Sequence, residues 1–93
     1  MKLIRFTTAE SPNPQFGIVV RDQAVPLAAL QRKAAKPSPH LADSQAYLAN
    51  LPDSERAAKD LAAWGEQHLG DLAANGERFP LNAVRLLEPV EVA

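Results

Sequence analysis

The run from Asp53 to Asn75, DSERAAKDLAAWGEQHLGDLAAN, constrains the fold of this chain more than any other stretch. At about 100° per residue, its apolar side chains gather on one helical face and its charged side chains point away from that face. The apolar stripe comprises Ala57, Leu61, Trp64, His68 and Leu72, bordered by Ala58, Gly65 and Leu69. The pattern predicts one long amphipathic helix over 54–75, against which the rest of the chain packs.

Capping residues and glycines set the expected boundaries and irregularities of this helix. We expect Asp53 or Ser54 to cap its N-terminus, and Asn75–Gly76 to end it with a left-handed pair. Gly65 borders the apolar face, where it would allow a close backbone approach. Gly70 faces solvent and marks the expected kink, because glycine is a weak helix former.

Two large side chains of the stripe have a structural interpretation. Trp64 stands among alanines and leucines, so we expect it to anchor the core and not to act as a stacking platform. His68 has no Asp or Glu at ligand spacing on its own face. We therefore interpret it as a partly buried histidine that bonds a backbone group, in preference to a catalytic residue.

Three segments before the helix alternate between apolar and polar residues, a pattern typical of strands. They are Lys2–Thr7, Gln15–Arg21 and Ala24–Leu27. Asp22-Gln23 is the expected two-residue hairpin turn between the second and third strands. Pro26 has no N–H, so the third strand should lie on a sheet edge or end there.

The elements together predict a single α+β domain over residues 1–93. It should be a small antiparallel sheet of three to four strands, the fourth being part of Val84–Leu87. Two helices, over 44–51 and 54–75, should cover one face only, because the strands alternate instead of being apolar throughout. Asp43 can cap the first of these helices, in which Tyr47, Leu48 and Leu51 have core spacing.

Two segments are expected outside this core. Residues 31–42 are predicted to be a mobile loop, preceded by one helical turn at Leu27–Leu30. The loop carries Arg32, Lys33 and Lys36, which we interpret as solvated cations, although they could contact an anion. Residues 84–93 are predicted to be a connector strand that leads to the next part of the protein.

The charge balance and the lack of cysteine exclude several classes of function. Ten Lys and Arg residues face eleven Asp and Glu residues, giving a net charge of −1, which argues against a surface that follows nucleic-acid phosphates. The chain has no cysteine, which excludes disulfides and thiolate metal sites and favours the cytoplasm. No apolar run approaches the roughly 20 residues of a membrane helix, so we expect no membrane partner.

No residue of the chain has a sequence context that indicates catalysis or binding. His40 and His68 are too few for a closed zinc site without cysteine. The four glycines are scattered and form no phosphate-binding motif. Glu88 and Glu91 would point to opposite faces of a strand. The serines have turn or capping contexts: Ser11, Ser38, Ser44 and Ser54. We therefore predict no catalytic, cofactor-binding or metal-binding residue here.

The two ends of the chain resemble the N-terminal domain of the fumarylacetoacetate hydrolase family. The resemblance lies in Lys2-Leu3-Ile4-Arg5-Phe6, in Phe16-Gly17-Ile18-Val19, and in Ala24-Val25-Pro26-Leu27-Ala28-Ala29-Leu30. The segment Pro80-Leu81-Asn82-Ala83-Val84-Arg85-Leu86-Leu87-Glu88-Pro89-Val90 is similar to the family's segment that leads into its catalytic domain. Pro26 departs from the pattern, since an acidic residue usually precedes the leucine.

The resemblance implies that this chain is the accessory N-terminal domain of a larger enzyme. Members of the family cleave a carbon–carbon bond of diketo acids such as acylpyruvates, or isomerise or decarboxylate related compounds. The carboxylates that hold Mg²⁺ or Mn²⁺ and the catalytic residues lie in the following domain, expected after residue 93, and none is carried over to this chain. The chain alone would then not be an enzyme, whereas its parent would be a hydrolase or isomerase. Its partners would be its own catalytic domain and a second copy of the parent, in a homodimer.

Two other hypotheses remain open from the sequence. The chain could be a free-standing interaction or dimerisation module that uses its helix face or an unpaired strand edge. A small enzyme in its own right is less well supported, because no acid, base and nucleophile are paired. The length of the native reading frame discriminates between an accessory domain and a free-standing module.

Overall fold

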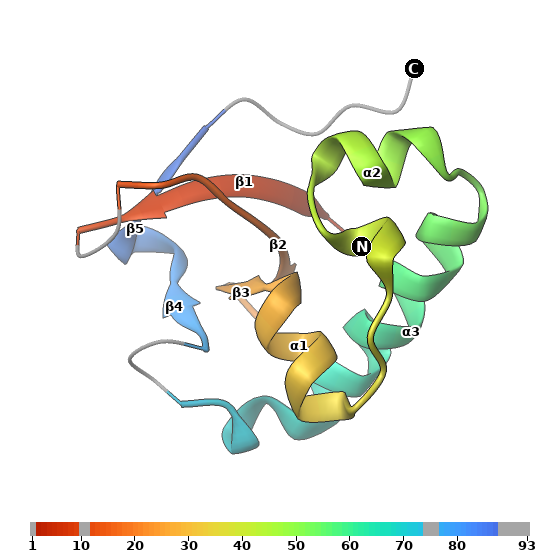
Figure 1. The fold of residues 1–93 in the computed structure, drawn as a ribbon. Helices are drawn as coiled ribbons and strands as arrows, with labels where there is room; N and C mark the ends of the chain where they lie inside the picture. Colours follow the sequence, from red (N-terminus) through yellow and green to blue (C-terminus); the bar gives the residue numbers. More distant parts are fainter. Residues whose placement is uncertain (1, 10–11, 74–76, 88–93) are drawn as a thin grey trace.

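The computed structural model describes residues 2–9, 12–73 and 77–87, and these form an α+β domain (Figure 1). Its antiparallel sheet has the strand order β4-β3-β2-β1-β5. The strands are β1 (Leu3–Thr8), β2 (Gln15–Val20), β3 (Gln23–Pro26), β4 (Phe79–Pro80) and β5 (Val84–Leu86). The helices are α1 (Leu27–Ala34), α2 (Ser44–Ala49) and α3 (Asp53–His68), with 3₁₀ turns at Pro39–Leu41, Leu69–Asp71 and Leu81–Ala83. The fold class is as predicted. The described sheet has five strands instead of the predicted three to four, and α1 is a third helix in addition to the two predicted ones.

The first three strands form a meander whose second turn differs from the prediction by one residue. Leu3 of β1 lies opposite Ile18 of β2, and Val20 of β2 lies opposite Gln23 of β3. The turn residues are Arg21 and Asp22, with φ of 48° and 63°. Positive φ at both positions is the geometry that joins two twisted strands through two residues. Gln23 is therefore the first residue of β3 and not part of the turn.

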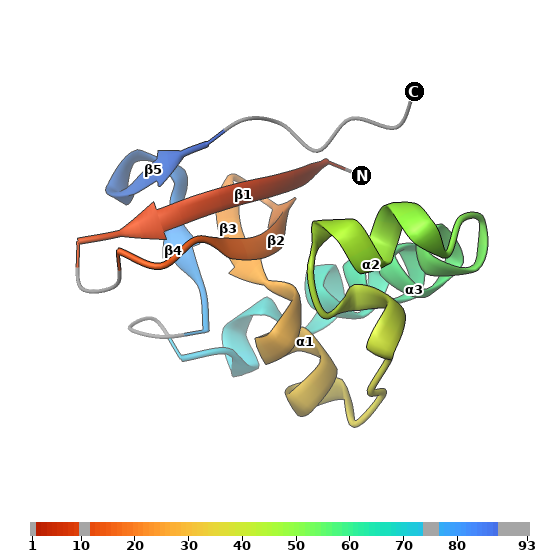
Figure 2. The ribbon, with the colours of Figure 1, turned by 45° about the horizontal axis from the view of Figure 1, so that its top comes forward.

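The last two strands lie on opposite edges of the sheet, and this makes the sheet curl. Phe79 and Pro80 of β4 pair with Ala24 and Gln23 of β3. Val84–Leu86 is a strand of the sheet, as the sequence predicted, and it pairs with β1. Because only the 3₁₀ turn at Leu81–Ala83 separates β4 from β5, one segment spans both edges of the sheet (Figure 2).

The curled sheet separates two apolar cores. The helices pack on one face, where the buried residues are Ile18, Val20, Val25, Leu27, Leu30, Leu41, Tyr47, Ala58, Leu61 and Leu72. The opposite face buries Ile4, Phe6 and Ala24 beneath Val19, Phe79, Leu81 and Val84. The helices therefore cover one face, as expected from the alternation of the strands, and the segment 79–84 covers the other.

Helix α3 is shorter than predicted. Leu61 and Leu72 of the predicted stripe are buried, but the buried face is rotated towards the border of that stripe. Regular helix ends at His68, and Leu69–Asp71 forms a 3₁₀ turn. The buried positions are Ser54, Ala58, Leu61 and Gly65. Trp64 is only half-buried at the border of the core, so the prediction that it anchors the core is wrong. The largest fully buried side chains are instead Tyr47 and Phe6.

The two glycines of this region behave as the sequence indicated. A Cβ at Gly65 would lie 3.2 Å from Leu30 Cδ2 and 3.5 Å from Val20 Cγ2, so α3 approaches α1 and the sheet closely. A Cβ at Gly70 would meet nothing within 4 Å, and Gly70 lies in the turn where the regular helix has ended. The predicted helix end at Asn75–Gly76 lies outside the described residues.

One predicted helix cap is present and the other is replaced. The Asp43 carboxylate accepts a hydrogen bond of 2.7 Å from the Ala46 amide and caps α2. Helix α3 follows Pro52, with no side-chain cap, so neither Asp53 nor Ser54 plays the predicted role. The Ser54 hydroxyl instead donates to the Tyr47 carbonyl oxygen at 2.6 Å and joins α3 to α2.

The segment 31–42 contains more regular structure than a loop. Helix α1 continues through Ala34, well beyond the single turn predicted, and ends at Ala35, whose φ is 54°. The Gln31 side chain accepts a bond of 2.8 Å from the Ser38 amide, and Leu41 is buried in the core. Mobility of this segment stays a prediction. Within the described residues, no helix has the length and apolar character needed to cross a membrane.

Candidate functional site

Residues 77–87 carry β4 and β5 and are called here the segment that closes the sheet. Glu77 fixes the start of this segment. The Glu77 carboxylate accepts a hydrogen bond of 2.8 Å from the Ala73 amide, and its oxygens lie 3.2 Å from Arg32 and 3.5 Å from Lys33. The hydrogen bond from Ala73, and then the two cations, lower the pKa of Glu77. Its side chain is only 12% exposed, although Arg32 and Lys33 remain open to solvent. Glu77 of the same chain is therefore the anion that pairs with Arg32 and Lys33, two of the three cations of the predicted loop.

Arg78 continues this attachment towards the sheet. Its Nε donates to the Leu72 carbonyl oxygen at 2.9 Å, and its Nη1 donates to Gln23 Oε1 at 3.2 Å. Glu77 and Arg78 therefore tie the segment that carries β4 and β5 to α1, to the end of the helical layer and to β3. Sequence reasoning missed both residues, because the side chains that they contact, Arg32, Lys33 and Gln23, are distant in the sequence.

The histidines occupy structural positions. The His68 ring stacks on Trp64, with centroids 4.4 Å apart and an interplanar angle of 14°. His68 Nδ1 lies 2.9 Å from the Trp64 carbonyl oxygen, and because a carbonyl can only accept, this nitrogen carries the proton. The predicted backbone bond of a half-buried His68 is confirmed. His40 lies apart, in the 3₁₀ turn at Pro39–Leu41.

The titratable groups of the helical layer do not converge. Glu55 pairs with Lys59 at 2.9 Å, and Asp53 pairs with Arg56 at 3.5 Å. Burial, and then the charge of Glu55, raise the pKa of Tyr47, so this phenol is neutral near pH 7. Across the described ranges, no three His, Asp or Glu side chains are grouped as metal ligands. Glu88 and Glu91 lie outside these ranges.

The serines have no arrangement that would activate a nucleophile. The Ser54 hydroxyl is used in the bond to Tyr47, and Ser44 is the first residue of α2. The Ser38 amide bonds Gln31 within the connection between α1 and the 3₁₀ turn. Ser11 lies outside the described residues.

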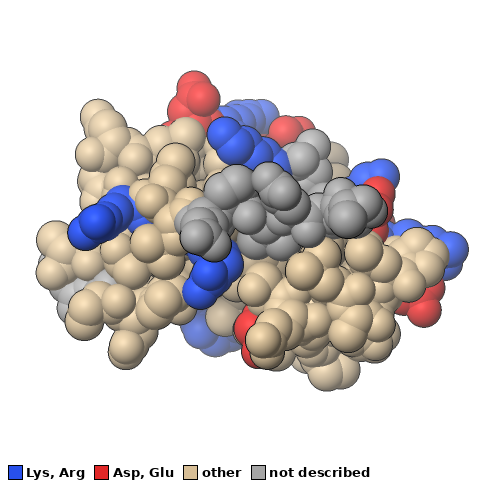
Figure 3. All heavy atoms as spheres, turned by 90° about the horizontal axis from the view of Figure 1, so that it is seen from above, with Lys and Arg blue, Asp and Glu red and all other residues tan. Residues whose placement is uncertain are grey.

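The surface near β5 is the more informative feature. Leu86 is 49% exposed, although it lies on a strand, and its only large apolar counterpart in the described chain is Leu48 of α2, 42% exposed. Among the described strands, β5 pairs with β1 only, so its other edge is open. Figure 3 shows that cations and anions are interspersed on the face seen from above, and that uncharged surface dominates it. This arrangement suits contact with a protein more than attraction of a polyanion.

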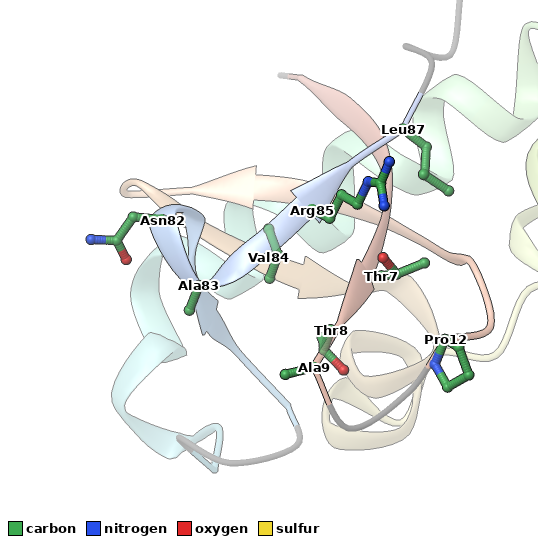
Figure 4. A pocket seen from close by; sticks show the side chains of 9 residues that line it. All are labelled: Thr7, Thr8, Ala9, Pro12, Asn82, Ala83, Val84, Arg85 and Leu87. Atoms are coloured by element: carbon green, nitrogen blue, oxygen red, sulfur yellow. The ribbon is translucent and has the colours of Figure 1, made fainter.

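A hollow of about 570 Å³ lies where β5 meets the end of β1 (Figure 4). It is lined by Thr7, Thr8, Ala9, Pro12, Asn82, Ala83, Val84, Arg85 and Leu87. None of these residues belongs to a set that the sequence singled out as a site. The strand pairing that creates the hollow joins segments nearly eighty positions apart, so no local pattern could have indicated it.

Comparison with known proteins identifies a family that extends over nearly the whole chain. A family model described as Rv2993c-like, N-terminal, matches residues 1–89. Comparisons with curated proteins and with solved structures gave no significant match.

Proposed function

Because the chain belongs to the Rv2993c-like N-terminal family, which is part of the N-terminal region of fumarylacetoacetate hydrolases, we propose that it packs on a catalytic domain and assists assembly without performing chemistry. The observation that carries this proposal is the extent of the family match, residues 1–89. The match includes the sheet, the helical layer and the segment that closes the sheet.

The attachment of the segment 77–87 supports a role as a rigid connector. This segment is tied at its start by Glu77 and Arg78, pairs with β3 through Phe79–Pro80, and ends on β1. A chain that leaves β5 therefore starts from a fixed direction relative to the core. In this proposal, the fixed position of β5 sets the point from which a following domain extends.

The open edge of β5 and Leu86 supply the contact surface in this proposal. An unpaired strand edge favours pairing with another chain segment unless it is covered. Burying a half-exposed leucine stabilises a contact by about 1 kcal/mol. We therefore place the docking surface for the catalytic domain at β5, and the homodimer of the parent would form through that larger assembly.

The chemistry in this proposal belongs to the catalytic domain. There, carboxylates would hold Mg²⁺ or Mn²⁺, which polarises the oxygens of a diketo acid as a Lewis acid. The reaction would be carbon–carbon bond hydrolysis of substrates such as acylpyruvates, or isomerisation or decarboxylation of related compounds, in the cytoplasm. The dispersed carboxylates and the Trp64-bound His68 of this chain support its exclusion from that chemistry.

The test is to express residues 1–93 alone and together with the reading frame that follows Ala93. With an acylpyruvate and excess Mg²⁺ or Mn²⁺, the chain alone should release no pyruvate above the buffer blank, and the longer chain should release it. Metal-dependent turnover by residues 1–93 alone would contradict the accessory role.

A matched pair of variants tests the docking surface. Leu86→Glu should lower the melting temperature of the longer chain, because it places a charge in the contact, and should have little effect on residues 1–93. Leu48→Glu, at the other exposed leucine, should have little effect in either. Equal effects of both variants in the longer chain would exclude β5 as the contact.

A free-standing interaction module is the second candidate, and the open edge of β5 also favours it. A stop codon directly after Ala93 in the native gene, together with self-association of residues 1–93 that Leu86→Glu abolishes, would support this function over the accessory role.

A further inference from the structure

Arg85 and Thr7 are directly opposed on neighbouring strands. The register of β1 and β5 places their Cα atoms as partners, so the two side chains project to the same face of the sheet. Figure 4 shows both side chains on one side of the paired strands, next to Leu87, at the hollow described above. The hollow therefore presents a guanidinium and a hydroxyl side by side.

Among the described residues, Arg85 has no side-chain hydrogen bond or ion pair, as is also the case for Arg5 and Arg21. Arg32, Arg56 and Arg78 all bond carboxylate or amide oxygens. In residues 2–9, 12–73 and 77–87, no carboxylate forms an ion pair with Arg85, and no acidic residue lines the hollow. Its guanidinium N–H groups, which form a rigid fork that matches an oxyanion, are therefore free to bind one.

The rest of the hollow is lined mainly by apolar side chains, together with the polar Thr8 and Asn82. Ala9, Pro12, Ala83, Val84 and Leu87 line the hollow with carbon, and Leu87 lies beside the Arg85 guanidinium (Figure 4). A volume of about 570 Å³ lies in the range of small-molecule sites. Carbon walls beside a single cation favour a ligand with an apolar body and one anionic group over a hydrated inorganic anion.

We propose that this hollow, called here the Arg85 hollow, binds the carboxylate of a small organic acid. Arg85 donates two N–H groups to the carboxylate, and the Thr7 hydroxyl donates a further hydrogen bond. The short carbon chain of the acid lies against Leu87, which is beside the guanidinium (Figure 4). The site goes beyond the accessory role and does not depend on the catalytic domain.

The test is an NMR titration of ¹⁵N-labelled residues 1–93 at constant ionic strength. Sodium acetate and sodium butyrate are the probes, and acetamide is the uncharged control of nearly the same shape as acetate. Both acids should shift the amide signals of Thr7, Arg85 and Leu87 with saturation, and butyrate should bind more tightly because its methylenes contact the apolar walls. Acetamide should cause no saturable shift.

Variants separate this site from general attraction to positive charge. Arg85→Gln should weaken acetate binding by about tenfold, and Arg85→Lys should weaken it less, because the charge remains and the fork is lost. Thr7→Val should weaken binding severalfold. Arg56→Gln, which removes an exposed cation of α3, should leave it unchanged.

Three results would overturn the proposal. The first is that acetamide shifts the amide signals as much as acetate does. The second is that acetate still binds Arg85→Gln with the same affinity. The third is that acetate shifts the amide signals of other arginines as much as the signal of Arg85. The spectrum of each variant without ligand reports whether it is folded, so a loss of binding is interpretable. Arg85 and Arg56 are exposed and Thr7 is only partly buried, so the fold is expected to tolerate these substitutions.

Discussion

The Ser54 hydroxyl donates a hydrogen bond of 2.6 Å to the Tyr47 carbonyl oxygen, at a point where Ser54 is completely buried. The bond links α2 to the first turn of α3 across the connection at Asn50–Pro52. The Tyr47 carbonyl oxygen also accepts a bond of 3.3 Å from the Asn50 amide. Loss of the serine would therefore weaken this oxygen's bonding without leaving it unpaired.

Ser54→Ala should destabilise the domain by about 1–2 kcal/mol, the range for loss of one buried hydrogen bond. Urea denaturation at pH 7 measures this change. Ser44→Ala, at the half-buried first residue of α2, is the matched control and should stay within about 0.5 kcal/mol. Equal losses for the two variants would mean that helix propensity, and not the link between the helices, sets the effect.

Tyr47→Ala should cost about 3–5 kcal/mol, because it removes one of the largest fully buried side chains and leaves a cavity. Its ring also packs edge-on against Phe16, with centroids 5.9 Å apart. Trp64→Ala should cost clearly less, because Trp64 is half-buried and its ring faces His68. Thermal unfolding of both variants checks the order, and a larger loss for Trp64 would place the core anchor on α3 after all.

The contrast between Tyr47 and Trp64 shows what the sequence could predict. Helix α3 was recognisable from its period, but Ala57 and Ala58 are both apolar, as are Trp64 and Gly65, so its rotation was not determined. The contacts that accompany this rotation come from Leu30 and Val20, whose side-chain carbons lie 3.2 Å and 3.5 Å from the place of a Cβ at Gly65. Such contacts between distant segments leave no mark in a local pattern.

The same distinction separates the predicted strands from the missed one. Strands β1 and β2 alternate over six residues each, and the Asp43 cap is a local signal. Strand β4 has two residues, one of them proline, and exists only because it pairs with β3. The sequence predicted the strand at Val84–Leu86, which forms part of the candidate site. It did not predict the register that places Arg85 opposite Thr7 and creates the Arg85 hollow.

Gly17→Ala and Gly70→Ala should have opposite effects on stability. A Cβ at Gly17 would collide with the Val25 carbonyl oxygen and lie 2.9 Å from Phe6 Cε1, in the middle of the sheet. This overpacking should cost at least about 1–3 kcal/mol. A Cβ at Gly70 meets no atom, and φ is not positive there, so alanine should stabilise by about 0.4–1 kcal/mol through the unfolded chain. Chemical denaturation of both variants measures the two signs, and a neutral Gly17→Ala would contradict the observed pairing of β2 with β3.

The contribution of Glu77 should depend on pH in a defined direction. The hydrogen bond from Ala73, together with Arg32 and Lys33, lowers the pKa of Glu77 in the folded state below its ordinary value of 4.5. A lowered folded pKa means that the unfolded chain binds the proton more readily, so the stabilisation is complete above about pH 4.5 and is lost as the pH falls through the folded pKa.

Glu77→Gln should therefore reduce the free energy of unfolding at pH 7, and the difference from the original chain should shrink as the pH falls below 4.5. Urea unfolding at pH 7 and at pH 3 measures both differences. Glu66→Gln, at an exposed position of α3, is the control and should cause little change at either pH. A loss of stability that is the same at pH 7 and pH 3 would show that the shape of the Glu77 side chain, and not its charge, fixes the segment that closes the sheet.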